Sequence, residues 1–343
     1  MRFFSYRRKK QLKTILLWSL LVLGTLLLLV GARFLYLQRY LVYTEDSVTL
    51  DYDQQLTAKR DPKPVLDPAD YPLQTILPQD GAPVSGPVDD SLKQLSGYYV
   101  TTVMLQKLDA VNEALSELEV EPDTMMFEMK SIFGNFYYSS SLFGQYTASS
   151  DIPAIEQLLA DLKKEKVYLI AKIPAFSDNN FALDNQSSGL PLKSGALWMD
   201  DNGCYWLDPL DADVQDFLAA LAAELSELGF DEVVFDGFAM PDSERIVYDT
   251  EKSREEYTAD AAQQLKAALS ELPIRISFGS SSALIAPHAD RLYLSDMEGG
   301  SVTAVAEPLS EQLEDPAAQI VFLTPSRDTR FEKYGVLRPL VEE

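Results

Sequence analysis

The apolar positions of the chain change their spacing repeatedly after residue 96, from the alternation of a β-strand to the three-and-four spacing of a helix. The predicted strands are 97–105, 124–130, 167–176, 231–240, 274–280, 291–295 and 318–324, and the only candidate for an eighth is 334–339. The predicted helices are 107–118, 152–165, 212–228, 251–272 and 304–313. This part of the chain therefore reads as strands alternating with helices.

Such alternation implies a parallel sheet, because a parallel connection needs a crossover that is usually a helix. The roughly 247 residues involved match the length of one (β/α)₈ barrel, which is typically about 250 residues. We therefore expect an α/β fold with a (β/α)₈ TIM-like barrel, its eighth unit complete or incomplete. A doubly wound open sheet is the alternative, but no glycine-rich phosphate-binding fingerprint follows an early strand.

A different pattern occupies the N-terminal part. Nineteen uncharged residues, 14–32, are rich in Leu and Val and would span about 28 Å as a helix, close to the thickness of a bilayer core. Six basic residues precede this run, and only Arg33 and Arg39 closely follow it, which by the positive-inside rule places the N-terminus in the cytoplasm. We expect an uncleaved signal anchor; a cleaved signal peptide is the alternative, although its apolar region is usually shorter.

Proline recurs through the segment that follows, seven times between residues 62 and 87. A segment of this composition has little to bury and favours extended, disordered conformations. The expected organisation is a basic cytoplasmic tail (1–13), a transmembrane anchor (14–37), a proline-rich extracytoplasmic linker (38–95) and a barrel domain (96–343).

Charge and composition narrow the chemistry. The chain of 343 residues has a formal net charge of −24, one His and one Cys. Residues 1–39 hold eight basic residues and no acidic one, so removing these eight from 29 leaves 21 basic against 53 acidic residues, a net charge of −32. A zinc site of several His or Cys ligands and an intramolecular disulfide are excluded, and so acidic a chain is a poor partner for nucleic acid. We read Cys204 as an unpaired loop residue and His288 as a cap or surface residue.

Functional groups of a barrel collect at the carboxyl ends of its strands. Glu128 and Lys130 are two positions apart at the end of the second strand, so alternation predicts that their side chains face the same side. Asp236 lies at the end of the fourth strand, and we expect all three side chains at the barrel mouth. Converging carboxylates suit glycoside hydrolysis, in which one group acts as an acid and a second as nucleophile or base. A structural ion network that closes the barrel is the alternative. The sixth strand supplies Tyr293 and, beyond it, Asp296 and Glu298.

The segment 178–208 is a long connection without a clear periodic pattern, and such connections are usually functional. It carries flat apolar rings and hydrogen-bonding acids, which suit pyranose rings: Asp178, Trp198, Asp200, Trp206 and Asp208. The alternative is that the two Trp residues close the top of the barrel.

A motif in this region resembles a known family. The run W-x-D-x-x-G-x-x-W-x-D-P from Trp198 to Pro209, followed by a helix and E-L-G-F-D-E-V-V-F-D from Glu227 to Asp236, resembles the bacterial putative glycosyl hydrolase domain family. The resemblance extends over most of 97–300 and implies a TIM barrel related to glycosidases, with Asp236 as nucleophile or substrate-binding acid. The chain departs from the family pattern after this strand. Gly237 occupies the position of an aromatic residue, and Ala239 occupies the position of an Arg. Without that Arg the site lacks a guanidinium that could bind a carboxylate through two hydrogen bonds.

The expected function is therefore hydrolysis of an extracellular or cell-wall polysaccharide by a membrane-anchored barrel. Asp236 is the expected nucleophile or base, Glu128 the expected acid, and Asp296 and Glu298 are the alternative acids. The expected substrate-binding residues are Lys130, Lys172, Asp178, Trp198, Asp200, Trp206, Asp208 and Tyr293. No cofactor and no metal site is implied, although a carboxylate-rich mouth suits Ca²⁺. The second hypothesis is a catalytically inactive barrel that binds a glycan or a partner from its anchor; the sequence leaves the oligomeric state open.

Overall fold

The computed structural model of the chain describes residues 41–44, 47–50, 92–248 and 251–341. The chain divides into two compact units, residues 1–84 and 85–343. In the first unit, β1 (Leu41–Thr44) and β2 (Ser47–Leu50) pair antiparallel. This hairpin lies within the predicted linker 38–95; the predicted tail, the anchor and the rest of the linker up to residue 91 lie outside the described residues.

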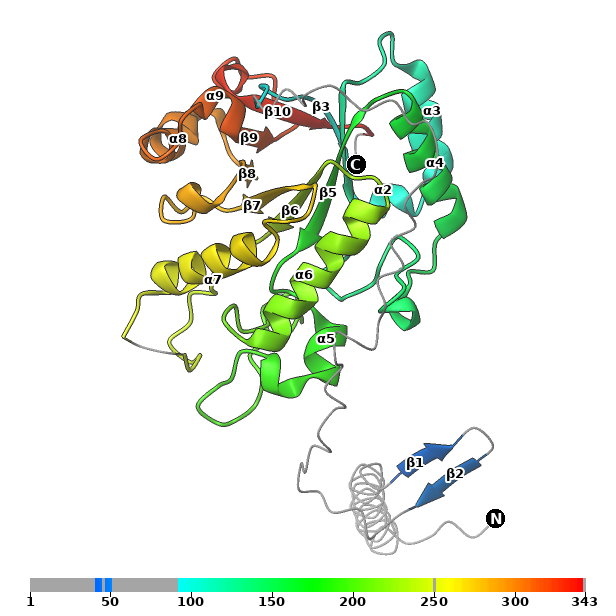
Figure 1. Cartoon of the computed structure of the whole chain (residues 1–343), viewed down its shortest axis with the longest axis vertical. Helices are drawn as coiled ribbons and strands as arrows, with labels where there is room; N and C mark the ends of the chain where they lie inside the picture. The colour runs from blue at the N-terminus through cyan, green and yellow to red at the C-terminus, as the bar shows by residue number, and fades with distance from the viewer. Residues whose placement is uncertain (1–40, 45–46, 51–91, 249–250, 342–343) are drawn as a thin grey trace, which may run out of the picture. The chain divides into compact units, whose positions relative to one another are not determined.

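The second unit is a closed barrel of eight parallel strands in the order β10-β3-β4-β5-β6-β7-β8-β9 (Figure 1). Its strands are β3 (Ser96–Val100), β4 (Thr124–Glu128), β5 (Tyr168–Pro174), β6 (Glu232–Asp236), β7 (Arg275–Gly279), β8 (Leu292–Ser295), β9 (Ile320–Leu323) and β10 (Gly335–Pro339). Its helices are α2 (Thr102–Leu105), α3 (Leu108–Glu117), α4 (Ile152–Lys164), α5 (Asn179–Asp184), α6 (Ala212–Glu227), α7 (Arg254–Ala268), α8 (Val302–Ser310) and α9 (Pro316–Gln319). The predicted (β/α)₈ TIM-like barrel is confirmed.

The eighth strand closes the barrel. The predicted segment 334–339 forms β10 from residue 335, and this strand pairs in parallel with β3 on one side and β9 on the other. Within the described residues, no helix follows β10. The eighth unit therefore supplies its strand, which is the part that closure of the sheet requires.

Helix ends follow capping chemistry in the sequence. Asp151 accepts a hydrogen bond from the Ala154 N–H at the start of α4, and Ser253 forms a capping box with Glu256 at the start of α7. The expected strand 97–105 was too long, because the Thr101 hydroxyl caps α2 and so ends β3 at Val100. These polar side chains satisfy backbone N–H groups that a helix leaves without partners.

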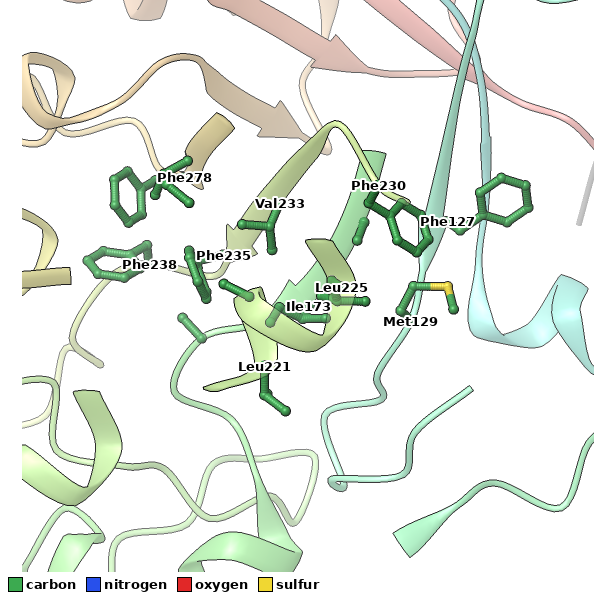
Figure 2. Packing of buried hydrophobic residues seen from close by; sticks show 14 of the residues in the cluster. Phe127, Met129, Ile173, Leu221, Leu225, Phe230, Val233, Phe235, Phe238 and Phe278 are labelled. Carbon is green, nitrogen blue, oxygen red and sulfur yellow. The ribbon is translucent and has the colours of Figure 1, made fainter. Parts of the chain in front are cut away.

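Two apolar layers result from the alternation along each strand. Met126, Ile170 and Val234 face the barrel interior, whereas Phe127, Ile173 and Phe235 face the helices. Figure 2 shows the outer layer, in which the strand side chains pack against residues of α6 and of the following turn. Burial of this continuous layer is the main force that holds the helices on the barrel.

The same alternation brings three charged residues to one end of the barrel. Glu128 lies opposite Lys172 in the register of β4 and β5, and Asp236 lies at the end of β6 with the parity of the interior residue Val234. Among the described residues, no helix combines the length and the apolar character that a membrane crossing would need.

Candidate active site

Three charged side chains meet at the mouth of the barrel. The Lys172 Nζ atom lies 3.0 Å from Glu128 Oε1 and 3.0 Å from Asp236 Oδ2. These two carboxylate oxygens are therefore at most about 6 Å apart, because both lie at 3.0 Å from one atom. The expected convergence of Glu128 and Asp236 is present, and the cation between them comes from β5.

The electrostatics of this cluster favour a charged lysine. Burial lowers the pKa of Lys172, but attraction by Asp236 and Glu128 and hydrogen bonds to both carboxylates outweigh burial, so the pKa is raised above its ordinary value. The Lys172 side chain is 13% exposed, against 24% for Glu128 and 32% for Asp236, so the carboxylates remain reachable from the mouth.

Backbone groups orient both carboxylates. The N–H of Thr102, in the first turn of α2, donates to Glu128 Oε2 at 2.9 Å. Asp236 Oδ1 lies against the backbone of Gly279, where an added Cβ would come within 2.4 Å of that oxygen. A side chain at position 279 would therefore displace Asp236, which explains why β7 ends in glycine beside it.

Two clefts meet at Lys172 and Asp236. One has a volume of about 460 Å³ and runs from Glu128 along α2 and the 131–137 segment. The other has a volume of about 770 Å³ and runs past the ends of β7 and β8. The charged cluster therefore lies between two hollows of the barrel mouth, a usual place for a ligand site in this fold.

Lys130 lines the smaller cleft, but it pairs with Asp178 and not with Glu128. The Lys130 Nζ atom lies 2.8 Å from Asp178 Oδ2, and both side chains are almost fully buried, at 0% and 1% exposure. Lys130 also lies over the ring of Phe217, on the helix side of the sheet. The expected Glu128–Lys130 pair is wrong because β4 ends at Glu128, so the alternation that predicted the direction of Lys130 stops there.

The two Trp residues pack on each other in the 178–208 segment. Their ring centroids are 5.8 Å apart at 79°, and the Trp206 Nε1–H donates to Asp200 Oδ2 at 3.0 Å. Neither ring is among the residues that line the two clefts, and both pack against a small apolar cluster that includes Leu190 and Met240. Their predicted role as sugar platforms stays a prediction.

Asp208 also makes internal contacts. Its Oδ1 atom accepts hydrogen bonds from the Tyr257 hydroxyl at 2.9 Å and from the Leu210 N–H at 3.1 Å. Burial is the main cause that raises the pKa of Asp208, although both hydrogen bonds lower it.

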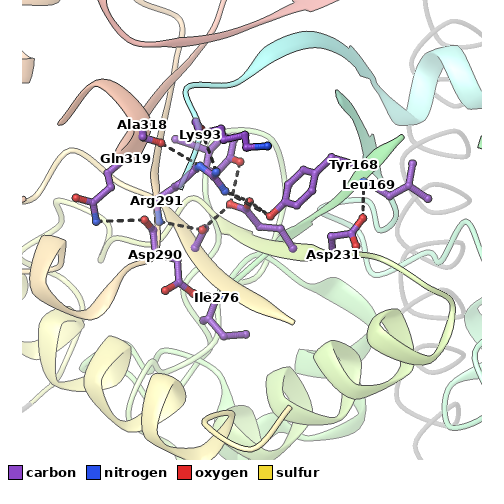
Figure 3. Close-up of polar contacts among 12 residues, drawn as sticks. Lys93, Tyr168, Leu169, Asp231, Ile276, Asp290, Arg291, Ala318 and Gln319 are labelled. Carbon is purple, nitrogen blue, oxygen red and sulfur yellow. Dashed lines mark hydrogen bonds and ion pairs between the residues drawn. The ribbon is translucent and has the colours of Figure 1, made fainter. Parts of the chain in front are cut away.

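Tyr293 points into the barrel rather than out of it. Its hydroxyl donates to Glu232 Oε1 at 2.9 Å, and Glu232 forms a buried ion pair with Arg291. Figure 3 shows the contacts of Arg291, whose guanidinium also donates to the backbone carbonyls of Lys93 and Ala318. Tyr293 also lines the larger cleft, so its predicted role in substrate binding stays a prediction.

The sixth strand brings one of its two acids to a cleft. Asp296 follows β8 with a φ of 56° and lines the larger cleft, whereas Glu298 is exposed and lines neither cleft. Across the described part of the chain, no group of three or more His, Cys, Asp or Glu side chains is arranged to hold a metal ion.

Sequence reasoning missed several residues of the site. It did not find the wall of the smaller cleft, which includes Val103, Ile132 and Phe133, nor the interior pair of Glu232 and Arg291. A signal for the pair existed, because Glu232 shares its parity with Val234 and Asp236 and must face the barrel interior. Nothing in the local pattern marked the cleft wall.

Residues 97–281 match the family described as "Putative glycosyl hydrolase domain". The chain belongs to this family. The match includes Glu128, Lys172, Asp236 and Gly279, so the whole charged cluster lies in the part that defines the family. The chain is thus a glycosidase-like barrel, and the resemblance seen in its motifs is confirmed.

Solved structures with a similar arrangement have low sequence identity. A hypothetical protein from Ruminiclostridium thermocellum is 20% identical, covers 53% of this chain and 96% of its own chain, and has a TM-score of 0.46. Ega3 from Aspergillus fumigatus, solved in complex with galactosamine, is 12% identical, covers 74% and 94%, and has a TM-score of 0.47. The glycoside hydrolase domain of PelA from Pseudomonas aeruginosa is 12% identical, covers 68% and 84%, and has a TM-score of 0.41. No curated protein matches the sequence.

Proposed function

We propose that the barrel hydrolyses glycosidic bonds of a polysaccharide by carboxylate catalysis. The observation that carries this proposal is the convergence of Glu128 and Asp236 on Lys172 where two clefts meet. Glycoside hydrolysis needs two carboxyl groups that flank the scissile bond, about 5–5.5 Å apart for retention of configuration and about 6.5–9.5 Å apart for inversion. The facing oxygens of Glu128 and Asp236 are at most about 6 Å apart, so the two carboxyl groups are close enough to flank one glycosidic bond.

Asp236 is the proposed nucleophile. The Lys172 ammonium lies 3.0 Å from the Asp236 Oδ2 atom and so places a positive charge beside the carboxylate that would attack the sugar. The position of Asp236 between the clefts also lets a sugar ring approach from either side.

Glu128 is the proposed acid, with Asp296 as the second candidate. Glu128 accepts from the Lys172 ammonium and from the Thr102 N–H, so bound substrate must displace one of these donors before a Glu128 oxygen can face the leaving-group oxygen. Asp296 lines the cleft on the other side of Asp236 and has no such constraint among the contacts described above. The pH–rate profiles of Glu128→Gln and Asp296→Asn distinguish them, because loss of the acid removes the alkaline limb.

Hydrolysis of a panel of amylose, xylan, carboxymethylcellulose, chitosan and 4-nitrophenyl glycosides tests the proposal. We expect Asp236→Asn to lower the rate about 10³-fold or more. The matched control is Asp201→Asn, which removes an exposed acid that lines neither cleft. Equal rates for Asp236→Asn and the unchanged protein would exclude Asp236 as a catalytic residue.

The second candidate function is glycan binding without turnover. Three observations favour it: one ammonium forms ion pairs with both carboxylates, β7 ends in Gly279 where it contributes no acid, and Ala239 stands where the family pattern has an Arg. Calorimetric binding to the same polymers, retained in Asp236→Asn and accompanied by no new reducing ends, supports this function over hydrolysis.

We also propose that the barrel acts outside the cytoplasm while residues 14–37 anchor it in the cell membrane. The apolar run, the preceding basic residues and the acidic body support this topology. Fractionation of cells that express the full chain, followed by protease treatment of intact spheroplasts, tests it. A barrel that stays protected from protease, or that appears in the soluble fraction at full length, contradicts the topology.

A further inference from the structure

We propose that the barrel cleaves inside a glycan chain, with sugar units bound on both sides of Asp236, and that Val103, Ile132 and Phe133 form an apolar platform for the units on the Glu128 side. This inference rests on the proposed hydrolase function and adds the mode of cleavage and the platform.

The first observation is the position of the charged cluster. Lys172 and Asp236 line the cleft of about 460 Å³ and also the cleft of about 770 Å³. An enzyme that removes terminal sugars needs a site closed behind the scissile bond, whereas an enzyme that cleaves internally needs room on both sides. The space on either side of Asp236 fits internal cleavage.

The second observation is the apolar wall of the smaller cleft. Val103, Ile132 and Phe133 are 51%, 36% and 43% exposed, and all three line this cleft above the charged floor. Large apolar side chains gathered at one place on a surface indicate a binding site rather than chance exposure. A pyranose ring has an apolar face and a polar rim, so it fits an apolar wall above a charged floor.

The turn that presents two of these side chains is fixed by its own hydrogen bonds. The Ser131 N–H donates to the Asn135 carbonyl at 2.9 Å, and the Gly134 N–H donates to the Ser131 carbonyl at 3.0 Å. The Asn135 N–H donates to the Ser131 hydroxyl at 3.1 Å. Gly134 has a φ of +86°, a conformation that favours glycine. Ile132 and Phe133 are therefore held in place before a ligand arrives.

Buried groups support the same turn from below. The Cys204 thiol donates to the Ile132 carbonyl at 2.8 Å. A Cβ at Gly134 would come within 2.2 Å of Asp178 Oδ1, the carboxylate that pairs with Lys130. The predicted substrate-binding residues Lys130 and Asp178 are thus positioning residues for the platform. A buried ion pair under an exposed apolar turn is expected where the position of that turn matters for binding.

The opposite cleft has a different lining. Ser280, Ser281, Ser282 and Thr258 line it together with Asp296. Hydroxyls and carboxylates of this kind bind the hydroxyl groups of sugars by hydrogen bonds. The site thus offers apolar contact on one side of Asp236 and polar contact on the other, which gives a bound chain one preferred direction.

The experiment measures product length with the panel polymer that the protein degrades fastest. Internal cleavage lowers the mean polymer length, measured by size-exclusion chromatography, well before free monosaccharide appears. Release of monosaccharide alone, with the polymer length unchanged early in the reaction, overturns this inference and leaves the hydrolase function intact. Absence of hydrolysis on every member of the panel overturns both.

The platform is tested with Phe133→Ala. We expect about a tenfold rise in KM for the polymer, because an aromatic contact is lost, with little change in the turnover of a 4-nitrophenyl glycoside that reaches only the charged floor. Leu142→Ala is the control, since Leu142 is 56% exposed and lines neither cleft. An unchanged KM in Phe133→Ala, or equal losses on the polymer and the small glycoside, overturns the platform.

Discussion

Lys172 and Asp236 form an ion pair of 3.0 Å at the meeting point of two clefts, and the same ammonium holds Glu128. Because attraction by both carboxylates outweighs burial and raises the pKa of Lys172, the stability that this cluster adds is fully present below the ordinary lysine pKa of 10.5. It is lost only as the pH rises through the raised pKa. Lys172 itself therefore causes no change of stability with pH between about pH 5 and pH 9.

Replacement of Lys172 by Met is expected to make the stability of the protein depend on pH in the acidic and neutral range. Two carboxylates close together then face each other without a cation, so the pKa of one of them rises and the folded protein loses stability as the pH rises through that value. We expect a loss of about 1–3 kcal/mol at pH 7 in urea unfolding, and a smaller loss at pH 4. A loss that is equal at both pH values would contradict the proposed repulsion.

The interior pair of Glu232 and Arg291 is expected to matter more for stability. Both side chains are buried, at 0% and 3% exposure, so removal of one leaves the other charged and without its counter-ion. We expect Arg291→Met to cost about 3–5 kcal/mol in urea unfolding. The control is Lys163→Gln, whose partner Asp231 is 32% exposed, and we expect a cost of about 0–1 kcal/mol there.

Glu224 of α6 is expected to hold the loop after β4. Its two carboxylate oxygens accept five hydrogen bonds from the 138–142 segment, among them the hydroxyls of Tyr138, Ser140 and Ser141. We expect Glu224→Ala to cost about 2–3 kcal/mol and to speed amide exchange in 138–142. Glu227→Ala, an exposed change on the same helix, serves as the control; similar exchange rates in both variants would refute the role of Glu224.

Removing the charge of Asp208 is expected to raise the stability of the fold rather than lower it. Burial raises its pKa, so its ionisation costs stability as the pH rises through the raised value. Asp208→Asn keeps an oxygen that accepts from Tyr257 and removes the charge. We expect a gain of a few tenths of a kcal/mol at pH 7 and none at pH 3, measured by thermal unfolding. A loss of stability at pH 7 would show that the charge itself is needed.

The fold could be predicted because it depends on local periodicity. Alternation within strands and three-and-four spacing within helices are properties of consecutive residues, and eight such units have one common solution in a closed parallel barrel. The positions of Glu128 and Asp236 followed from the same rule, since parity along a strand fixes which face a side chain takes.

Tertiary structure alone decided the partners of these carboxylates. The alternation along β4 could not predict where the Lys130 side chain points, because Lys130 lies beyond the last residue of this strand. There the turn, and not the strand, sets the direction of the side chain, which pairs with Asp178. Lys172 was placed correctly in its strand, but its two ion pairs depend on the register of β5 with both neighbours.

The sequence by itself determined the barrel, the acidic body and the two strand ends that carry the proposed catalytic acids. Only the closed barrel decided that Lys172 pairs with both carboxylates and that exposed apolar side chains lie next to them. It also decided that the Tyr293 hydroxyl donates to Glu232 in the barrel interior. The physical reason is sequence separation. Ionic and apolar contacts across a barrel join residues more than forty positions apart, as Glu128 and Lys172 do, and their geometry is set only when the sheet closes.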